Sequence, residues 1–187
     1  MQVTGSPDIP LHASSFTQTA SKVEMEAVGR FFRTFPFGRF GAVITTEVKR
    51  PASLTPLDVV AEVVKRRIIE VAKWTPFRAV KVIFESSDRA NCLIEAAFGQ
   101  FQIEEDGRPI PVECYFMPKS ANDPALEVAD FVMHAVWGQA RRTMANRAGY
   151  GRDFMAVFHG VDPRLTSYMH ITGIEGPQSA PALTVTP

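Results

Sequence analysis

The chain has 187 residues, of which 45% are hydrophobic and 21% charged, the composition of an ordinary globular protein. This balance argues against a wholly disordered chain. Twenty basic residues offset twenty acidic ones, so the net charge gives no sign of a nucleic-acid partner. Any such binding would have to depend on a local patch of charge.

The two cysteines, Cys92 and Cys114, stand alone in apolar stretches and are expected to be buried free thiols. Neither a CxxC zinc motif nor a disulfide framework is supported. No apolar run reaches the roughly 20 residues of a membrane span. The first residues also lack the basic-then-apolar pattern of a signal peptide. These features predict a cytoplasmic protein without a membrane partner.

The first twenty residues are rich in Ser, Thr and Pro and predict an irregular segment. Ser21 and Glu24 then have the spacing of a capping box, which indicates a helix start. The buried side of this helix is expected to carry Val28, Phe31 and Phe32. Residues 40–46 predict a buried strand.

The middle of the chain alternates helices and strands. Thr55 and the following proline predict a helix start, and residues 79–85 form the clearest strand of the chain. Asp88 is expected to start a further helix. A turn at Asp106-Gly107 and a strand at residues 110–116 follow.

Asp123 and Pro124 open the longest predicted helix, which runs towards Gly149. A short apolar segment at residues 154–158 and a strand at 167–172 complete the pattern. Strands that alternate with helices predict an α/β fold with a largely parallel sheet covered by helices. We therefore expect one domain over residues 21–174, between an irregular segment, 1–20, and a disordered tail, 175–187.

Three polar residues interrupt the apolar part of the longest helix, which is expected to be buried on most sides. Glu127, Asp130 and His134 are three and four residues apart and share one stripe. A carboxylate in apolar surroundings needs a partner. Asp130 either accepts hydrogen bonds from backbone amides or an arginine, or binds a metal ion. His134 is either a satisfied core histidine or a metal ligand.

Glu85 ends the clearest strand, at the edge where open α/β sheets place their ligand sites. Asp88 and Arg89 follow within one turn. Mg²⁺ or Mn²⁺ prefers carboxylate oxygens, and two such ions can activate water against a phosphodiester. Helix capping at the next helix start is the alternative role for Glu85 and Asp88.

Five phenylalanines and three arginines alternate between residues 30 and 40. Aromatic rings beside arginines can stack bases and hold phosphates. The rings could equally join the core while the arginines are solvated. Nucleic-acid contacts are predicted for Arg33, Arg39 and Arg89.

Three segments, LHAS (11–14), VIFESSDR (82–89) and ALEVADF (125–131), resemble the bacterial domain-of-unknown-function 3800 family. The resemblance covers roughly residues 11 to 175 and implies a ribonuclease H-like fold, in which acidic residues come from the first strand, a central strand and a late helix. Glu85 matches the central-strand acid, and Asp130 matches the helix acid.

The chain departs from the family at its start, because members open with a strand that carries an Asp-Glu-Ser motif. Only ten residues precede Leu11, and their single acid is Asp8, which is flanked by prolines and does not lie within an apolar strand. We expect the first strand to be missing, through a shortened chain, a degenerate relative, or completion of the sheet by a second chain.

The sequence thus predicts a metal-dependent nuclease-like hydrolase with an incomplete active site. Glu85 and Asp130 would bind Mg²⁺ or Mn²⁺, supported by Asp88, Glu127 and His134. The alternative is a non-catalytic nucleic-acid or protein-interaction module. A homo-oligomer is expected if a sheet edge is exposed.

Overall fold

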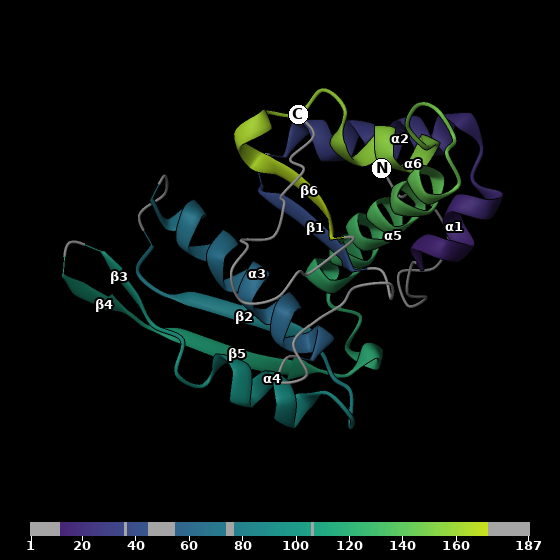
Figure 1. Cartoon of the computed structure of the whole chain (residues 1–187). Helices are drawn as coiled ribbons and strands as arrows, with labels where there is room; N and C mark the ends of the chain where they lie inside the picture. Colours follow the sequence, from purple (N-terminus) through teal and green to yellow (C-terminus); the bar gives the residue numbers. More distant parts are fainter. Residues whose placement is uncertain (1–11, 36, 45–54, 74–76, 106, 172–187) are drawn as a thin grey trace. The chain divides into compact units, whose positions relative to one another are not determined.

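The computed structural model describes residues 12–35, 37–44, 55–73, 77–105 and 107–171 (Figure 1). The chain divides into two compact units, Met1–Arg50 with Glu127–Pro187, and Pro51–Leu126. No helix within the described ranges is long and apolar enough to cross a membrane. The elements follow in the order α1 (Ala13–Thr19), α2 (Lys22–Thr34), β1 (Arg39–Ile44), α3 (Pro56–Ala72), β2 (Val80–Glu85), α4 (Asn91–Phe98), β3 (Ile103–Glu105), β4 (Arg108–Ile110), β5 (Val112–Met117), α5 (Pro124–Met144), α6 (Arg152–Phe158) and β6 (Thr166–Ile171), with single 3₁₀ turns at Lys119–Ala121 and Pro163–Leu165.

Local capping signals set the start of three helices as predicted. Ser21 and Glu24 form a complete capping box at α2, and Thr55 and Asp58 form another at α3. The hydrogen bond from the Ser21 side chain lowers the pKa of Glu24, and that from the Thr55 backbone lowers the pKa of Asp58. Asp123 accepts the backbone N–H groups of Ala125 and Leu126 at the start of α5.

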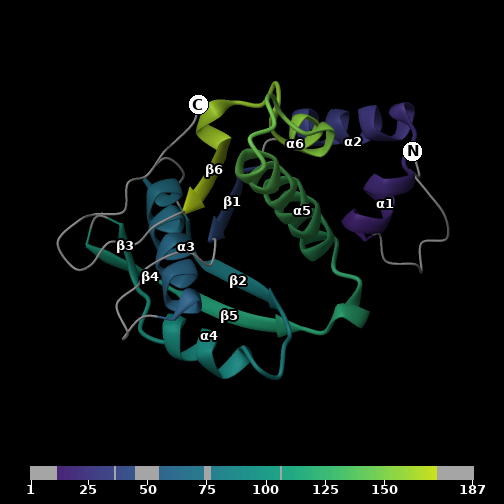
Figure 2. The ribbon, with the colours of Figure 1, turned by 45° about the vertical axis from the view of Figure 1, so that its right-hand side comes forward.

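The first unit packs α1, α2, α5 and α6 with the parallel pair β1 and β6 (Figure 2). The strand register runs from Arg39 opposite Thr166 to Ile44 opposite Ile171. Gly41 brings β1 against α5, since a Cβ added there would lie 2.3 Å from Val136 Cγ2. The buried core of this unit consists of Ala13, Phe16, Ala20, Met25, Val28, Phe32, Val43, Phe131, Val132, Ala135, Val136, Ala140 and Val157.

The second unit is built on the parallel pair β2 and β5, with Val80 opposite Val112. Side chains alternate along both strands between partly buried and exposed. The partly buried face packs with α3 and α4 through Ala61, Ile94 and Phe98, and the opposite face carries exposed residues such as Ile83 and Tyr115. An antiparallel hairpin, β3 and β4, precedes β5.

The structure is therefore mixed α/β, and two of its three described strand pairs are parallel. Residues 13–19 form α1 although the sequence predicted an irregular segment, and residues 154–158 belong to α6. Helix α4 begins at Asn91 rather than Asp88, and the Asn91 side chain hydrogen-bonds to Ser86 and Ser87 in the preceding turn. Asp106 of the predicted turn, and the predicted tail at 175–187, lie outside the described residues.

Two glycines give opposite expectations for replacement by alanine. A Cβ at Gly138, within α5, would meet no atom within 4 Å, whereas one at Gly41 would collide with Val136. Gly138→Ala should raise the free energy of unfolding by about 0.5–1 kcal/mol, because alanine loses less backbone entropy in a helix. Gly41→Ala should lower it by about 1–3 kcal/mol through overpacking.

Urea unfolding of the two variants, followed by circular dichroism, measures both changes. Equal effects of the two substitutions would contradict the close approach of β1 to α5.

Candidate functional site

Asp130 lies on the exposed side of α5, so the prediction that it is buried among apolar groups is wrong. Its Oδ2 atom accepts the backbone N–H of Ala13 at 3.0 Å. Ala13 is the first residue of α1, where a carboxylate satisfies a free amide and matches the positive end of the helix dipole. Of the two interpretations of Asp130, the amide hydrogen bond is the one present in the structure.

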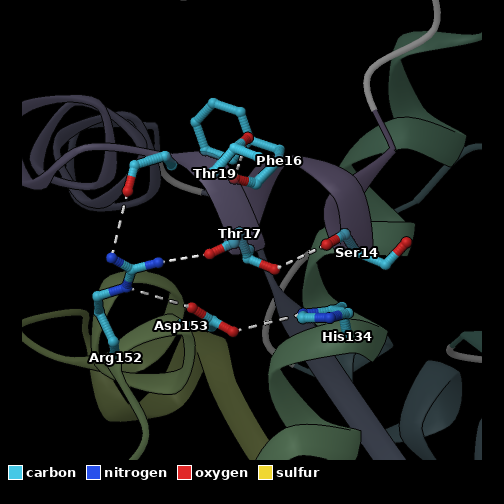
Figure 3. Close-up of polar contacts among 8 residues, drawn as sticks. Ser14, Phe16, Thr17, Thr19, His134, Arg152 and Asp153 are labelled. Atoms are coloured by element: carbon cyan, nitrogen blue, oxygen red, sulfur yellow. Dashed lines mark hydrogen bonds and ion pairs between the residues drawn. The ribbon is translucent and has the colours of Figure 1, made fainter.

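Arg152 holds the other end of α1. Its guanidinium donates to the carbonyl oxygens of Thr17 and Ala20, as Figure 3 shows for the labelled Thr17. A cation at the carboxyl end of a helix also matches the helix dipole. The seven-residue helix α1, too short to be stable alone, is thus fixed at both ends by charges from α5 and α6.

His134 faces Asp153 of α6, with 3.5 Å between Nδ1 and Asp153 Oδ2 (Figure 3). Asp153 also lies 3.8 Å from Arg152 Nε. The separation from His134 is long for a hydrogen bond, so this is an ion pair when the imidazole is protonated. Asp153 and Arg152 had no signal in the sequence, because only the packing of α6 against α5 and α1 gives them partners.

The other predicted acids occupy separate places. Glu85 is the last residue of β2, as predicted, and its side chain is exposed. It stands opposite Met117 of β5. Asp88 and Arg89 are exposed in the turn before α4, and Glu127 is half-buried in the first turn of α5. Glu85 and Asp88 belong to the second compact unit, while Asp130 belongs to the first.

No group of three His, Cys, Asp or Glu side chains is placed to hold a metal ion within the described part of the chain. Asp130 uses one oxygen for the Ala13 amide, and His134 is directed to Asp153. The Mg²⁺ or Mn²⁺ site stays a prediction, and no catalytic step is derived from such an ion.

Arg39 is 3% exposed, so its predicted contact with nucleic acid is wrong. Its guanidinium donates to three carbonyl oxygens: Val157 at 2.8 Å, Phe32 at 2.6 Å and Phe37 at 3.4 Å. The rings of Phe32 and Phe37 lie 5.1 and 4.7 Å from its central carbon. Burial lowers the pKa of Arg39, yet arginine keeps its charge in proteins.

Two phenylalanines of the same segment are exposed to solvent, unlike the buried Arg39. Phe31 and Phe35, four residues apart, have ring centroids 5.0 Å apart and are 38% and 51% exposed. The prediction that Phe31 is buried is therefore wrong. Arg30 and Arg33 of the same helix are exposed. We call Phe31, Phe35, Arg30 and Arg33 the aromatic platform.

The platform rests on a fixed base. The ring of Phe31 lies 5.3 Å from that of Phe32 and 5.8 Å from that of Phe37, the two rings that flank Arg39. The stem of Arg33 runs past Gly160, where an added Cβ would lie 3.1 Å from Arg33 Cδ. These contacts order the rings of Phe31 and Phe35, while Arg33, two positions from Phe31 along the helix, lies on the other flank of α2 beside Gly160.

Comparison of this chain with protein-family models, with curated proteins and with solved structures gives no match.

Removal of the Arg39 guanidinium should destabilise the first unit strongly. Arg39→Leu keeps much of the side-chain volume but leaves buried carbonyl oxygens without a donor, at roughly 1–3 kcal/mol for each unsatisfied group. We expect the free energy of unfolding to fall by about 3 kcal/mol or more.

Urea unfolding measures this change, with Arg30→Leu as the exposed control on the same segment. A loss for Arg39→Leu no larger than that for Arg30→Leu would contradict the structural role of Arg39.

Proposed function

We propose that this chain is a non-catalytic module that binds single-stranded nucleic acid through the aromatic platform. The observation that carries the proposal is the pair of exposed rings, Phe31 and Phe35, on a segment that also carries the exposed cations of Arg30 and Arg33. Every base has a π-face, so such rings bind single strands with little preference for sequence. A cytoplasmic location is part of this proposal.

Each group of the platform has a distinct role in this binding. The exposed rings of Phe31 and Phe35 offer apolar surface on which unpaired bases stack. The guanidinium groups of Arg30 and Arg33 form charge-assisted hydrogen bonds with phosphate oxygens. The base of Phe32 and Phe37 keeps the rings ordered before binding, which lowers the entropic cost of association.

Electrostatics limits this function to a local surface. The formal net charge of the chain is zero, so no long-range field attracts a polyanion. Two arginine–phosphate contacts give a slope of about −1.4 for log K against log salt concentration with single strands. The affinity should therefore be modest and should fall as salt rises.

Phe35→Ala should weaken binding of a fluorescein-labelled single-stranded oligonucleotide about tenfold, since base stacking contributes roughly 1–3 kcal/mol per base. Fluorescence anisotropy at several salt concentrations measures the affinity. Arg33→Ala should also reduce the magnitude of the salt slope by about 0.7.

The matched control is Val23→Ala, which removes an exposed apolar side chain near the other end of α2. Equal affinities for Phe35→Ala and the wild type, or no binding by the wild type at low salt, would refute the proposal.

The second candidate is a divalent-metal-dependent phosphodiesterase of the ribonuclease H-like class. One observation favours it: Glu85 is exposed at the carboxyl end of a parallel strand, where α/β folds place ligand sites. The parallel pairs in both units are compatible with a ribonuclease H-like sheet. The hydrogen bond of Asp130 to Ala13 and the absence of a metal-holding group in the described residues count against it.

A cleavage assay with Mn²⁺ separates the two candidates. A non-catalytic module leaves labelled single-stranded and duplex nucleic acid intact, whereas the second candidate cuts it and loses activity in Asp130→Asn. The asparagine oxygen can still accept the Ala13 N–H, so this variant should stay folded. Mn²⁺-dependent cleavage by the wild type that Asp130→Asn abolishes would replace the first proposal with the second.

A further inference from the structure

The solvent-facing side of α5 is apolar although the helix is part of a folded unit. Met133, Trp137 and Met144 are 43%, 46% and 48% exposed. The spacings of four and seven residues place them on one stripe, which the half-buried Leu126 extends towards the start of the helix. We call these four residues the α5 stripe. Asp130 and Arg141, both exposed, border it.

The stripe has the spacing of a coiled-coil seam. Residues 126, 133, 137 and 144 follow one another at intervals of seven, four and seven residues, a spacing that lets two helices pack side by side, while Ala140 is buried in the core of the first unit. Tryptophan supplies large contact area at interfaces, and methionine adapts to a partner surface. A seam of this kind fits a second α-helix better than a flat surface.

We infer that the α5 stripe binds the same stripe of a second copy of this chain, with the two α5 helices antiparallel. The charges decide the direction. A parallel pair would bring Asp130 near Asp130 and Arg141 near Arg141 of the second copy, which is unfavourable. An antiparallel pair brings Asp130 of each copy near Arg141 of the other.

One register satisfies both the charges and the apolar contacts. A two-fold axis at residue 135 places Trp137 against Met133 of the second copy, and Met144 against its Leu126. The same register brings Asp130 near the exposed Arg141 of the second copy. Asp130 keeps its bond to Ala13 through Oδ2, and a carboxylate has further acceptor sites for an arginine. The interface is self-complementary, as a two-fold dimer requires.

The dimer should be weak and should depend on concentration. Stable interfaces bury roughly 1,200–2,000 Å², and a single helix face of 21 residues is small in comparison. The stripe lies on α5 and the aromatic platform on α2, so dimerisation does not depend on the proposed binding of nucleic acid.

Sedimentation velocity over a range of protein concentrations up to roughly 1 mM tests the dimer. The wild type and Val23→Glu should shift from monomer to dimer as concentration rises, whereas Trp137→Glu should stay monomeric. Both substitutions place a charge at an exposed apolar position of a helix, and circular dichroism checks that both variants are folded. A monomeric wild type at every concentration, or equal behaviour of the two variants, would overturn the proposal.

Disulfide trapping tests the direction in a Cys92→Ser background, which removes the exposed native thiol. Chains with Leu126→Cys and chains with Met144→Cys, tagged to differ in mass, are mixed and oxidised. The antiparallel register predicts cross-links between the two kinds of chain, because disulfides need Cα atoms within about 7 Å. Cross-links only between chains of the same kind would refute the antiparallel pairing.

Discussion

The first unit depends on one buried cation. Arg39 begins β1 and donates to carbonyl oxygens at the carboxyl ends of α2 and α6. The Phe32 carbonyl needs such a donor, because the residue four positions later is Pro36, which has no N–H. Burial of a guanidinium is costly unless its donors are used. The two negative helix ends, together with the flanking rings, offset that cost.

The burial of Arg39 also separates the arginines and phenylalanines of residues 30–40 into a buried group and an exposed group. Arg39 holds Phe32 and Phe37 in an inner layer, and this order leaves Phe31 and Phe35 at the surface. A similar principle governs α1, where Asp130 and Arg152 bind opposite ends of a short helix. Asp130 and Arg39, which suggested metal and phosphate binding in the sequence, thus stabilise helix ends.

The sequence predicted what neighbouring residues determine. The capping boxes of α2 and α3 and the alternation of β2 depend on groups within a few positions. It failed for α1, because the partner of Ala13 is 117 positions away. The sequence-based prediction also failed for Arg39. No local pattern distinguishes an arginine in solvent from one that is buried between the ends of two helices. Asp130 was recognised as a residue that needs a partner, but its partner could not be identified.

Helix α5 shows a further limit of periodicity. A helix that is apolar on nearly all sides is expected to be covered on nearly all sides, yet Met133 and Trp137 are exposed. Burial of an apolar surface contributes the same favourable free energy whether the residues that cover it belong to the same chain or to another. The pattern therefore predicts burial without specifying the molecule that provides it. The charges beside the stripe, Asp130 near one end and Arg141 near the other, distinguish the two directions for a second copy, because an antiparallel copy of the helix satisfies both charges and a parallel copy satisfies neither.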